Sequence, residues 1–356
     1  MHRRQRAGKT SEPGGAGCGG GFAVIEQSLP WQDLQWQRMS SMQASARLPH
    51  ALLLRGPEGV GKVRFARRLV SALLCERRAF QQRPCGDCRS CRLVAADSHP
   101  DLHALAPLEG KQQIGIDQVR SLIERIGLTP QYGGRKTVVV SPAERMTRAA
   151  ANTLLKTLEE PPGDALFVLV AHRAGALPAT IRSRCQIMDF PVPDADSAKS
   201  WLAEELDSEE AAETALRLAH GAPLNALLQA SGGGLEARET ILDDLEGLLR
   251  GDGDPIASAD RWRQLGLVEA LYWLLSVVCD LVWLKNGRSA HSLTHSDRGP
   301  ALQGLARGLD LMGLFRLFDH LVEARRAALG QLNFNEQLTL ESVAIECQRS
   351  GARRED

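Results

Sequence analysis

The sequence is poor in aromatic residues and has no excess charge of either sign. Aromatic side chains make up 4% of the 356 residues, and the 43 basic residues balance the 43 acidic ones, so the formal net charge is zero. A protein that binds nucleic acid tightly on its own usually carries a basic excess, and many such proteins stack bases on aromatic rings. The composition therefore favours protein partners, or DNA contact that is shared with them.

Long apolar runs and targeting signals are also missing. The longest apolar candidate, residues 271–284, is interrupted by Asp280, and it is shorter than the roughly 20 residues that cross a bilayer. We expect a buried helix there and no membrane partner. Residues 1–23 lack the apolar core of a signal peptide. We expect them to be a disordered tail, or an extension read from a wrongly chosen upstream start codon; a transit peptide is a further alternative.

The cysteines do not form the pattern of a disulfide framework. Four of the eight are scattered, at positions 18, 185, 279 and 347. Free cysteines in a chain without a secretion signal are typical of a reducing compartment, so we expect a cytoplasmic protein.

The other four cysteines are clustered with the spacing C-x9-C-x2-C-x2-C, at Cys75, Cys85, Cys88 and Cys91. Four thiolates can surround Zn²⁺ tetrahedrally, at about 2.3 Å each. Because the protein would fill all four positions, the spacing predicts a structural zinc ion in a small module over residues 75–91. The alternative is four unrelated, reduced cysteines.

A phosphate-binding loop is present at residues 56–62, which read G-P-E-G-V-G-K. In the pattern G-x-x-x-x-G-K, backbone N–H groups and a lysine cradle phosphates between a strand and a helix. The residues that would form the cradle here are Gly56, Gly59, Gly61 and Lys62.

The residues that make such a loop catalytic are absent. Val63 stands where a Ser or Thr hydroxyl would bind Mg²⁺. The apolar run 138–140 leads into Ser141 and Pro142, rather than into the acidic residues that hold Mg²⁺ and orient water. The retained lysine leaves weak nucleotide binding open, but we expect ATP binding to be weak or absent and no turnover.

Apolar runs that alternate with amphipathic segments predict an α/β domain over residues 24–190, a parallel sheet with helices on both faces. Strands are expected near residues 51–54, 138–140, 166–170 and 186–190. Helices are expected after the loop, over 116–126, and over about 148–160, where Pro161 and Pro162 stop the helix.

Beyond residue 190 the pattern becomes almost entirely helical. We expect a small helical domain over residues 191–230, a break at the Ser-Gly-Gly-Gly segment 231–234, and an all-α domain over 235–350 with a polar loop near 286–300.

With these motifs in place, residues 24 to about 350 resemble the delta-prime subunits of the bacterial DNA polymerase III clamp loader, which belong to the AAA+ class. Four motifs carry the resemblance: the loop with its cysteine cluster, H-P-D at 99–101, N-T-L-L-K-T-L-E-E-P-P at 152–162, and L-P-A-T-I-R-S-R-C at 177–185. The degraded nucleotide site favours delta-prime over the related, ATP-hydrolysing tau/gamma subunits.

The resemblance implies an AAA+ domain, a helical lid and a C-terminal oligomerisation collar. It also implies that Arg184, in the motif Ser183-Arg184-Cys185, reaches into the ATP site of a neighbouring subunit, where a permanently charged guanidinium suits a transferring phosphoryl group. Without the resemblance, an ordinary surface arginine in a salt bridge would be the preferred interpretation.

Two further positions depart from the pattern of the active relatives. Those relatives carry a γ-phosphate-sensing Thr where this chain has Ala171-His172, and an arginine where this chain has Leu224. Each part that supports hydrolysis is therefore altered.

The function implied is that of a non-catalytic stator in the DNA polymerase III holoenzyme, with tau/gamma and delta subunits as partners, and with the sliding clamp and primed DNA contacted through the complex. One alternative is the ATP-hydrolysing motor subunit itself, which Lys62 favours and the missing magnesium ligands oppose. Another is a stand-alone zinc-dependent nucleic-acid-binding protein, which neutral charge and scarce aromatics oppose.

Overall fold

The computed structural model describes residues 28–77, 84–132, 134–329 and 335–351. The extension expected at residues 1–23 lies outside these ranges. The chain divides into two compact units: the first contains residues 38–54 and 63–188, and the second contains residues 29–37, 55–62 and those from 189 onward. The three domains predicted from the sequence stay a prediction.

A five-stranded sheet forms the centre of the α/β part, with the strand order β2-β3-β4-β1-β5. In chain order the strands are β1 (Ala51–Arg55), β2 (Leu102–Leu105), β3 (Lys136–Val140), β4 (Ala165–Ala171) and β5 (Gln186–Asp189). β2 pairs with β3 in parallel, with Leu102 opposite Thr137. β3 pairs with β4 in parallel, with Lys136 opposite Ala165.

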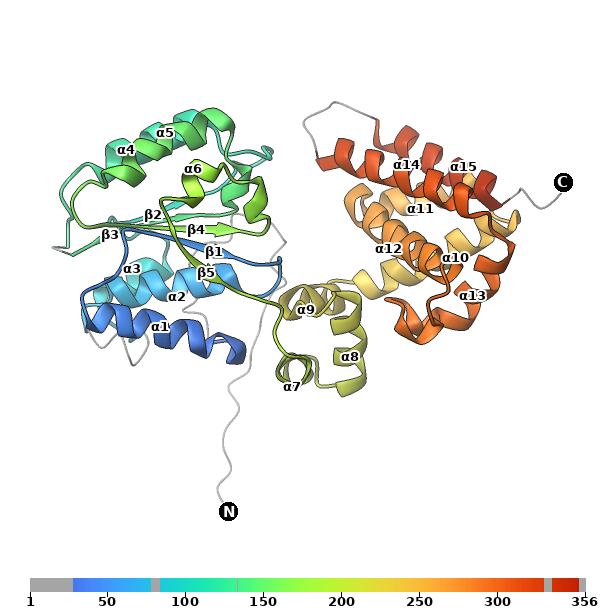
Figure 1. Cartoon of the computed structure of the whole chain (residues 1–356), viewed down its shortest axis with the longest axis horizontal. Coiled ribbons are helices and arrows are strands. Elements are labelled where there is room, and N and C mark those ends of the chain that lie inside the picture. The colour runs from blue at the N-terminus through green and yellow to red at the C-terminus, as the bar shows by residue number, and fades with distance from the viewer. Residues whose placement is uncertain (1–27, 78–83, 133, 330–334, 352–356) are drawn as a thin grey trace, which may run out of the picture. The chain divides into compact units, whose positions relative to one another are not determined.

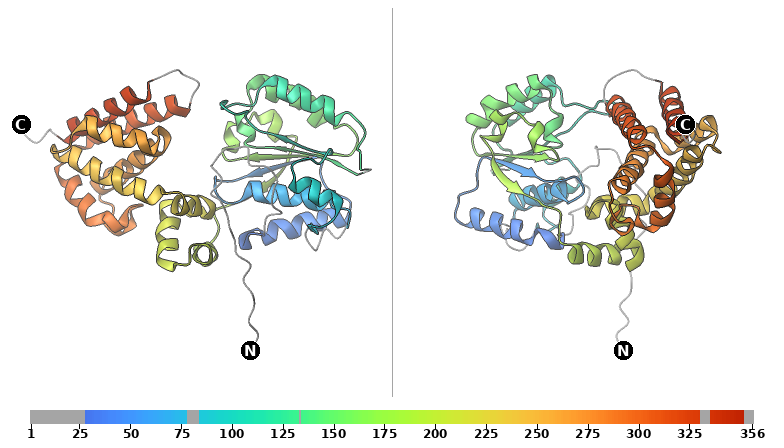
Figure 2. Two further views of the ribbon diagram at one scale, coloured as in Figure 1. Left: turned by 180° about the vertical axis from the view of Figure 1, so that it is seen from behind. Right: turned by 45° about the vertical axis from the view of Figure 1, so that its right-hand side comes forward.

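The central strands are buried on both faces, because apolar residues occupy successive positions instead of alternating with polar ones. Residues 51–54 of β1 and all of β4 are buried. Helices α4 and α5 cover one face, and α1, α2 and α3 cover the other (Figures 1 and 2). The predicted fold class, a parallel sheet with helices on both faces, is confirmed.

Local signals in the sequence determine where these helices begin and end. α5 starts after Thr147, whose hydroxyl accepts a hydrogen bond from the Ala150 N–H, and it ends just before Pro161 and Pro162. The helices of this part are α1 (Asp33–Ala44), α2 (Lys62–Leu74), α3 (Arg89–Ala95), α4 (Ile116–Ile126), α5 (Arg148–Glu159) and α6 (Ala179–Arg182).

Helices follow one another after β5, as the sequence predicts. The first group is α7 (Ala195–Leu206), α8 (Glu209–Leu218) and α9 (Pro223–Ser231). The second group is α10 (Gly234–Arg250), α11 (Pro255–Leu265), α12 (Leu267–Lys285), α13 (Gly299–Gly308), α14 (Leu311–Leu329) and α15 (Glu336–Gly351). Asp194 caps α7 through the Ser197 N–H, and Ser208 caps α8 through the Ala211 N–H.

α12 is the central helix of the second group. It packs against α14 and α10, and its residues Trp273, Leu274 and Val278 are fully buried in one large apolar cluster. By length and composition α12 is the one helix in the described ranges that could cross a membrane, and 56% of its most apolar window is buried inside the protein. Its burial agrees with the prediction of a core helix for this segment.

A buried polar network lies beside α12. Arg238 of α10 donates from Nε to His295 Nδ1 at 2.9 Å and forms an ion pair with Asp297. His295 Nε2 bonds to the Ser276 hydroxyl, while the Asp280 carboxylate accepts from the backbone N–H groups of Thr294 and His295. These bonds satisfy charges that would otherwise be costly to bury.

Candidate functional site: a sealed phosphate loop, an exposed arginine and a four-cysteine cluster

The phosphate loop connects β1 to α2, and its glycines allow close backbone approaches. A side chain at Gly56 would place its Cβ 1.9 Å from the Phe190 carbonyl oxygen, and Gly59 and Gly61 have left-handed φ angles of +80° and +91°. Only glycine adopts this combination readily. The loop therefore has the backbone form that a phosphate cradle requires.

Lys62, the lysine of the loop, bonds to the loop itself. Its Nζ donates to the Gly56 carbonyl at 2.7 Å and to the Pro57 carbonyl, and the residue is 2% exposed. In a working phosphate loop this amine reaches the β- and γ-phosphates. Here the Lys62 ammonium group is bound by the Gly56 and Pro57 carbonyls, and not by phosphate oxygens.

Segments far from the loop in the sequence fasten it further. The Trp31 indole N–H donates to the Val60 carbonyl at 3.0 Å, and the Gln32 amide donates to Val60 and, at 2.9 Å, to Gly61. From α9, the Leu224 N–H donates to the Gly59 carbonyl. Trp31 and Gln32 are not predictable from the loop motif, because nothing in the pattern of residues 56–62 indicates partners about thirty positions earlier in the chain.

The two positions where a hydroxyl and a carboxylate usually bind Mg²⁺ carry other residues here. Val63 follows Lys62 on α2, and β3 ends at Val140, before Ser141. The nearest downstream carboxylate, Glu144, accepts the backbone N–H groups of His172 and Arg173 at 3.0 and 3.1 Å. Glu144, which has no signal in the sequence motifs, thus caps the backbone just after β4.

Arg184 lies between α6 and β5, with its side chain 34% exposed. Its Nε donates to Glu159 Oε1 at 2.7 Å, and its Nη1 donates to the Thr180 carbonyl at 3.0 Å. Glu159 is the last residue of α5 and belongs to the L-E-E-P-P motif. The structure therefore joins two of the four motifs that carry the resemblance, those at 152–162 and 177–185, through one ion pair.

The two neighbours of Arg184 have structural contacts of their own. The Ser183 hydroxyl donates to the Thr180 carbonyl at 3.1 Å, closing the turn after α6. Cys185 is buried in the core beneath α5, and this burial raises the pKa of its thiol to about 11. Together they fix the backbone on both sides of the arginine while its guanidinium stays accessible.

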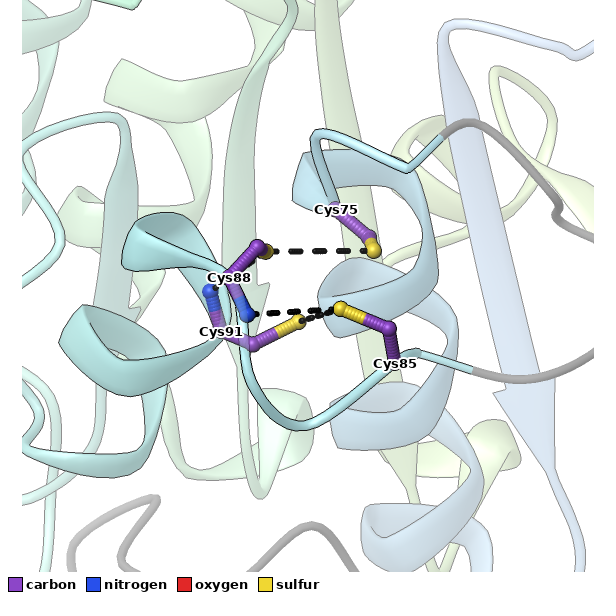
Figure 3. A group of neighbouring side chains, drawn as sticks. All are labelled: Cys75, Cys85, Cys88 and Cys91. Atoms are coloured by element: carbon purple, nitrogen blue, oxygen red, sulfur yellow. Dashed lines mark hydrogen bonds between the residues drawn. The ribbon is translucent and has the colours of Figure 1, made fainter.

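The four clustered cysteines converge in space (Figure 3). Their sulfur atoms all lie within 4.8 Å of one another, with 4.0 Å between Cys75 and Cys88 and 3.9 Å between Cys85 and Cys91. A tetrahedral ion with zinc–sulfur bonds of about 2.3 Å would give sulfur–sulfur edges of about 3.8 Å. The four sulfurs are therefore placed as ligands of one metal ion.

The electrostatics of this cluster fit a dication. The backbone N–H groups of Cys88 and Cys91 donate to the sulfurs of Cys85 and Cys88, and the first of these bonds lowers the pKa of Cys85 to about 6. Burial raises the pKa of Cys75 and of Cys91. Thiolates at such buried positions need a positive charge nearby, and a metal ion bound by the four sulfurs would supply it.

His99 and His103 do not belong to this metal-binding group among the described residues. His103 lies on β2. His99 is only 4% exposed, so it is a core residue rather than a surface one, and burial lowers its pKa.

Two family models match the chain. The model described as "DNA polymerase III, delta subunit" matches residues 31–194, and "DNA polymerase III, delta subunit, C terminal" matches residues 233–349. Among solved structures, a DNA polymerase III gamma subunit-related protein from Thermotoga maritima is 18% identical, with a TM-score of 0.40, over 88% of this chain and 99% of that one. That likeness is too distant to bear on function.

Curated relatives are closer in sequence. The DNA polymerase III subunit delta' of Pseudomonas aeruginosa is 36% identical over 326 residues, which cover 89% of this chain and 96% of that protein. The Escherichia coli subunit delta' is 32% identical over 318 residues, which cover 89% and 94%. On these matches, which span both the α/β part and the helices beyond it, the chain belongs to the family of DNA polymerase III delta-prime subunits.

Proposed function

We propose that this chain is a non-catalytic clamp-loader subunit that completes the ATP site of a neighbouring ATPase with Arg184. It acts within a complex of tau/gamma and delta subunits in the cytoplasm, and the complex loads the sliding clamp onto primed DNA. Membership of the delta-prime family supports this role over the motor and over a stand-alone nucleic-acid-binding protein.

One observation carries the non-catalytic part of the proposal: the Lys62 amine binds the carbonyls of its own loop. A nucleotide would have to displace these bonds, and those from Trp31 and Gln32 to the same loop. With Val63 in place of a hydroxyl residue, bound nucleotide would also lack one of its magnesium ligands. The phosphate loop then serves as a structural turn that links β1 to α2.

The contribution in trans rests on Arg184. The Arg184 side chain is one-third exposed, and its guanidinium nitrogens bond to Glu159 and to the Thr180 carbonyl, so the group is held near the surface and not in the core. Such a planar, permanently charged group stabilises the charge that develops on a transferring phosphoryl group. In this proposal the helices after residue 234 form the collar that joins the subunits.

The four cysteines hold a structural zinc ion in this proposal. Every ligand position is filled by a thiolate, which leaves no open position for a water molecule or substrate. The ion would tie the end of α2, where Cys75 lies, to the start of α3, where Cys91 lies.

The experiment that tests the function measures phosphate release by the chain alone, by the tau/gamma and delta subunits without it, and by those subunits with it. The purified chain alone should release no phosphate from ATP in the presence of Mg²⁺. The tau/gamma and delta subunits should co-purify with it, and their ATPase rate should rise when it is added. Magnesium-dependent turnover by the chain alone would favour the motor, and tight, salt-sensitive DNA binding by the chain alone would favour the nucleic-acid-binding protein.

A further inference from the structure

The motif His99-Pro100-Asp101 follows the cysteine cluster in the sequence, and the proposed function gives it no role. In the structure His99 and Asp101 are 4% and 1% exposed, and Ser90, which lies between two of the clustered cysteines, is 1% exposed. Buried polar groups of this kind are stable only when hydrogen bonds satisfy them. Their partners show what the motif holds together.

The first set of bonds runs from the motif to the cysteine cluster. The Asp101 backbone N–H donates to His99 Nδ1 at 3.1 Å, so Nδ1 carries the lone pair and the ring proton is on Nε2. Nε2 then donates to the Ser90 hydroxyl at 2.8 Å, and that hydroxyl donates to the Leu74 carbonyl at 2.6 Å. Every group in this chain of bonds has one consistent role.

Ser90 therefore connects the two segments that carry the clustered cysteines, which we call the two arms: the end of α2 with Cys75, and residues 85–91. Its hydroxyl binds the carbonyl of the residue before Cys75, and its backbone N–H donates at 3.0 Å to the carboxylate of Glu76, the residue after Cys75. Ser90 itself precedes Cys91. His99 is thus hydrogen-bonded to Ser90, a residue that contacts both sides of Cys75 and lies next to Cys91.

The second set of bonds runs from the motif to a turn before β3. The two carboxylate oxygens of Asp101 accept the backbone N–H groups of Gln131 and Tyr132, at 2.9 and 3.1 Å. The Tyr132 ring lies 5.2 Å from the His99 ring, and the Arg89 guanidinium lies over it at 5.4 Å. Arg89 is the first residue of α3, next to the cysteine Cys88.

We propose that Ser90, His99 and Asp101 couple the four-cysteine metal site to the Gln131–Tyr132 turn, so that metal binding orders this turn. The metal ion holds the two arms of the cluster together, and Ser90 can bond to both arms only in that arrangement. His99 bonds to Ser90, and Asp101 bonds to the turn, so the position of the arms determines the position of the turn. His99 is a positioning residue in this arrangement. The inference rests on the proposed metal site, because the ion is the group that would hold Cys75 to the segment that carries Cys85, Cys88 and Cys91.

The test uses the two tyrosines of the chain, Tyr132 and Tyr272. The full-length protein is labelled with 3-fluorotyrosine, its zinc content is measured, and its ¹⁹F NMR spectrum is recorded before and after removal of zinc by a chelator. Tyr272 lies on α12 and serves as the internal reference, and Tyr132→Phe assigns the signals. On zinc removal the Tyr132 signal should move toward that of free fluorotyrosine, and the Tyr272 signal should stay.

Two variants examine the role of His99. His99→Ala should still bind one zinc ion but release it to a chelator faster, by up to about tenfold, the lower end of the effect seen when a direct partner of a metal ligand is removed, because His99 acts one bond further out through Ser90. Its Tyr132 signal should also be shifted while zinc is bound. His103→Ala, the matched control on β2, should behave as the unchanged protein.

The outcomes separate the two proposals. A chain that takes up no zinc overturns the metal site and this inference with it. A chain that binds zinc but keeps the Tyr132 signal unchanged after zinc removal overturns the coupling alone. So does a His99→Ala variant that releases zinc as slowly as the unchanged protein.

Discussion

At the scale of single residues, three charged groups of the nucleotide-site motifs are bound by other groups of the same chain. Lys62 binds carbonyls of its own loop, Glu144 binds backbone N–H groups at the end of β4, and Arg184 is paired with Glu159. Each is a group that an active or completing site would use on phosphate, magnesium or water. Only Arg184 remains substantially exposed, so it is the one of the three that can act on another molecule.

Glu159 restrains Arg184 and should weaken its attraction for a neighbour's ATP. Glu159→Gln keeps the size of the side chain and removes the opposing charge. Exposed ion pairs contribute about 0.2–1 kcal/mol, so the ATP concentration that gives half the maximal rate of the reconstituted complex should fall by up to about fivefold. Glu160→Gln, which removes the same charge from the next residue, is the control. An unchanged or higher half-maximal concentration in Glu159→Gln alone would speak against restraint by Glu159.

Residue-level predictability depended on how far apart the partners are in the sequence. The short motifs were predictable because their residues lie close together in the sequence at a fixed spacing. They comprise the loop glycines, Lys62, Val63 and the four cysteines. Trp31, Gln32 and Glu144 were missed, since each acts on backbone about thirty positions away. The contact between Arg184 and Glu159, 25 positions apart, was not predicted either, although both motifs had been noted.

At the scale of elements, the sheet and its helices were largely predictable. Apolar runs such as 51–54 and 166–170 are buried on both faces, and this leaves a continuous apolar signal. Strand β2 was not predicted, because it is an edge strand of four residues, three of them incompletely buried. The boundaries of α5 show how local residues define a helix. It starts after a capping threonine and ends before two prolines, and the prolines made its end predictable.

Zinc binding should depend on the four clustered cysteines and not on the other cysteines of the chain. Cys88→Ser removes one of the four converging sulfurs, and the variant should lose its zinc, from one ion per chain to none, when measured by elemental analysis. Cys279→Ser removes a cysteine of α12 outside the cluster and should retain one ion. Equal zinc content in both variants would contradict the four-thiolate site.

The helical part should lose stability in acid through His295. Burial lowers the pKa of His295 to about 3, so between about pH 6.5 and 3 the unfolded chain binds a proton here that the folded chain does not. The free energy of unfolding should therefore fall with pH by up to about 1.4 kcal/mol per unit from this residue. Asp280 acts in the opposite direction, because burial raises its pKa.

Comparison of variants isolates the contribution of His295. Urea unfolding between pH 7 and 5 should show a smaller loss of stability in His295→Gln than in the unchanged protein, even though the variant is less stable at pH 7. His291→Gln, at an exposed position nearby, should keep the full slope. Equal slopes in all three proteins would rule out the buried histidine as the acid-sensitive group.

At the scale of the whole molecule, the described residues form a parallel sheet covered by helices on both faces, followed by two groups of helices. The formal net charge of the chain is zero, whereas strong binding of DNA by a single chain usually goes with a basic excess, and in the proposed function Arg184 is the group that acts on another subunit. These properties suit a subunit whose activity exists only in an assembly. The family was predictable from the sequence because the motifs at 152–162 and 177–185 occur together; the subunit order in a ring was not, since nothing in one chain specifies it.

The central claim is that this chain supplies a guanidinium to an ATP site that it does not itself contain. The most direct measurement is the ATPase rate of the complex reconstituted with Arg184→Ala, alongside Arg182→Ala as a control from the preceding turn. Both variants should assemble. Arg184→Ala should lower turnover at the adjacent site by on the order of 10³-fold, and clamp loading should fall with it, while Arg182→Ala should leave turnover intact. A fully assembled Arg184→Ala complex that hydrolyses ATP at the unchanged rate would contradict the account.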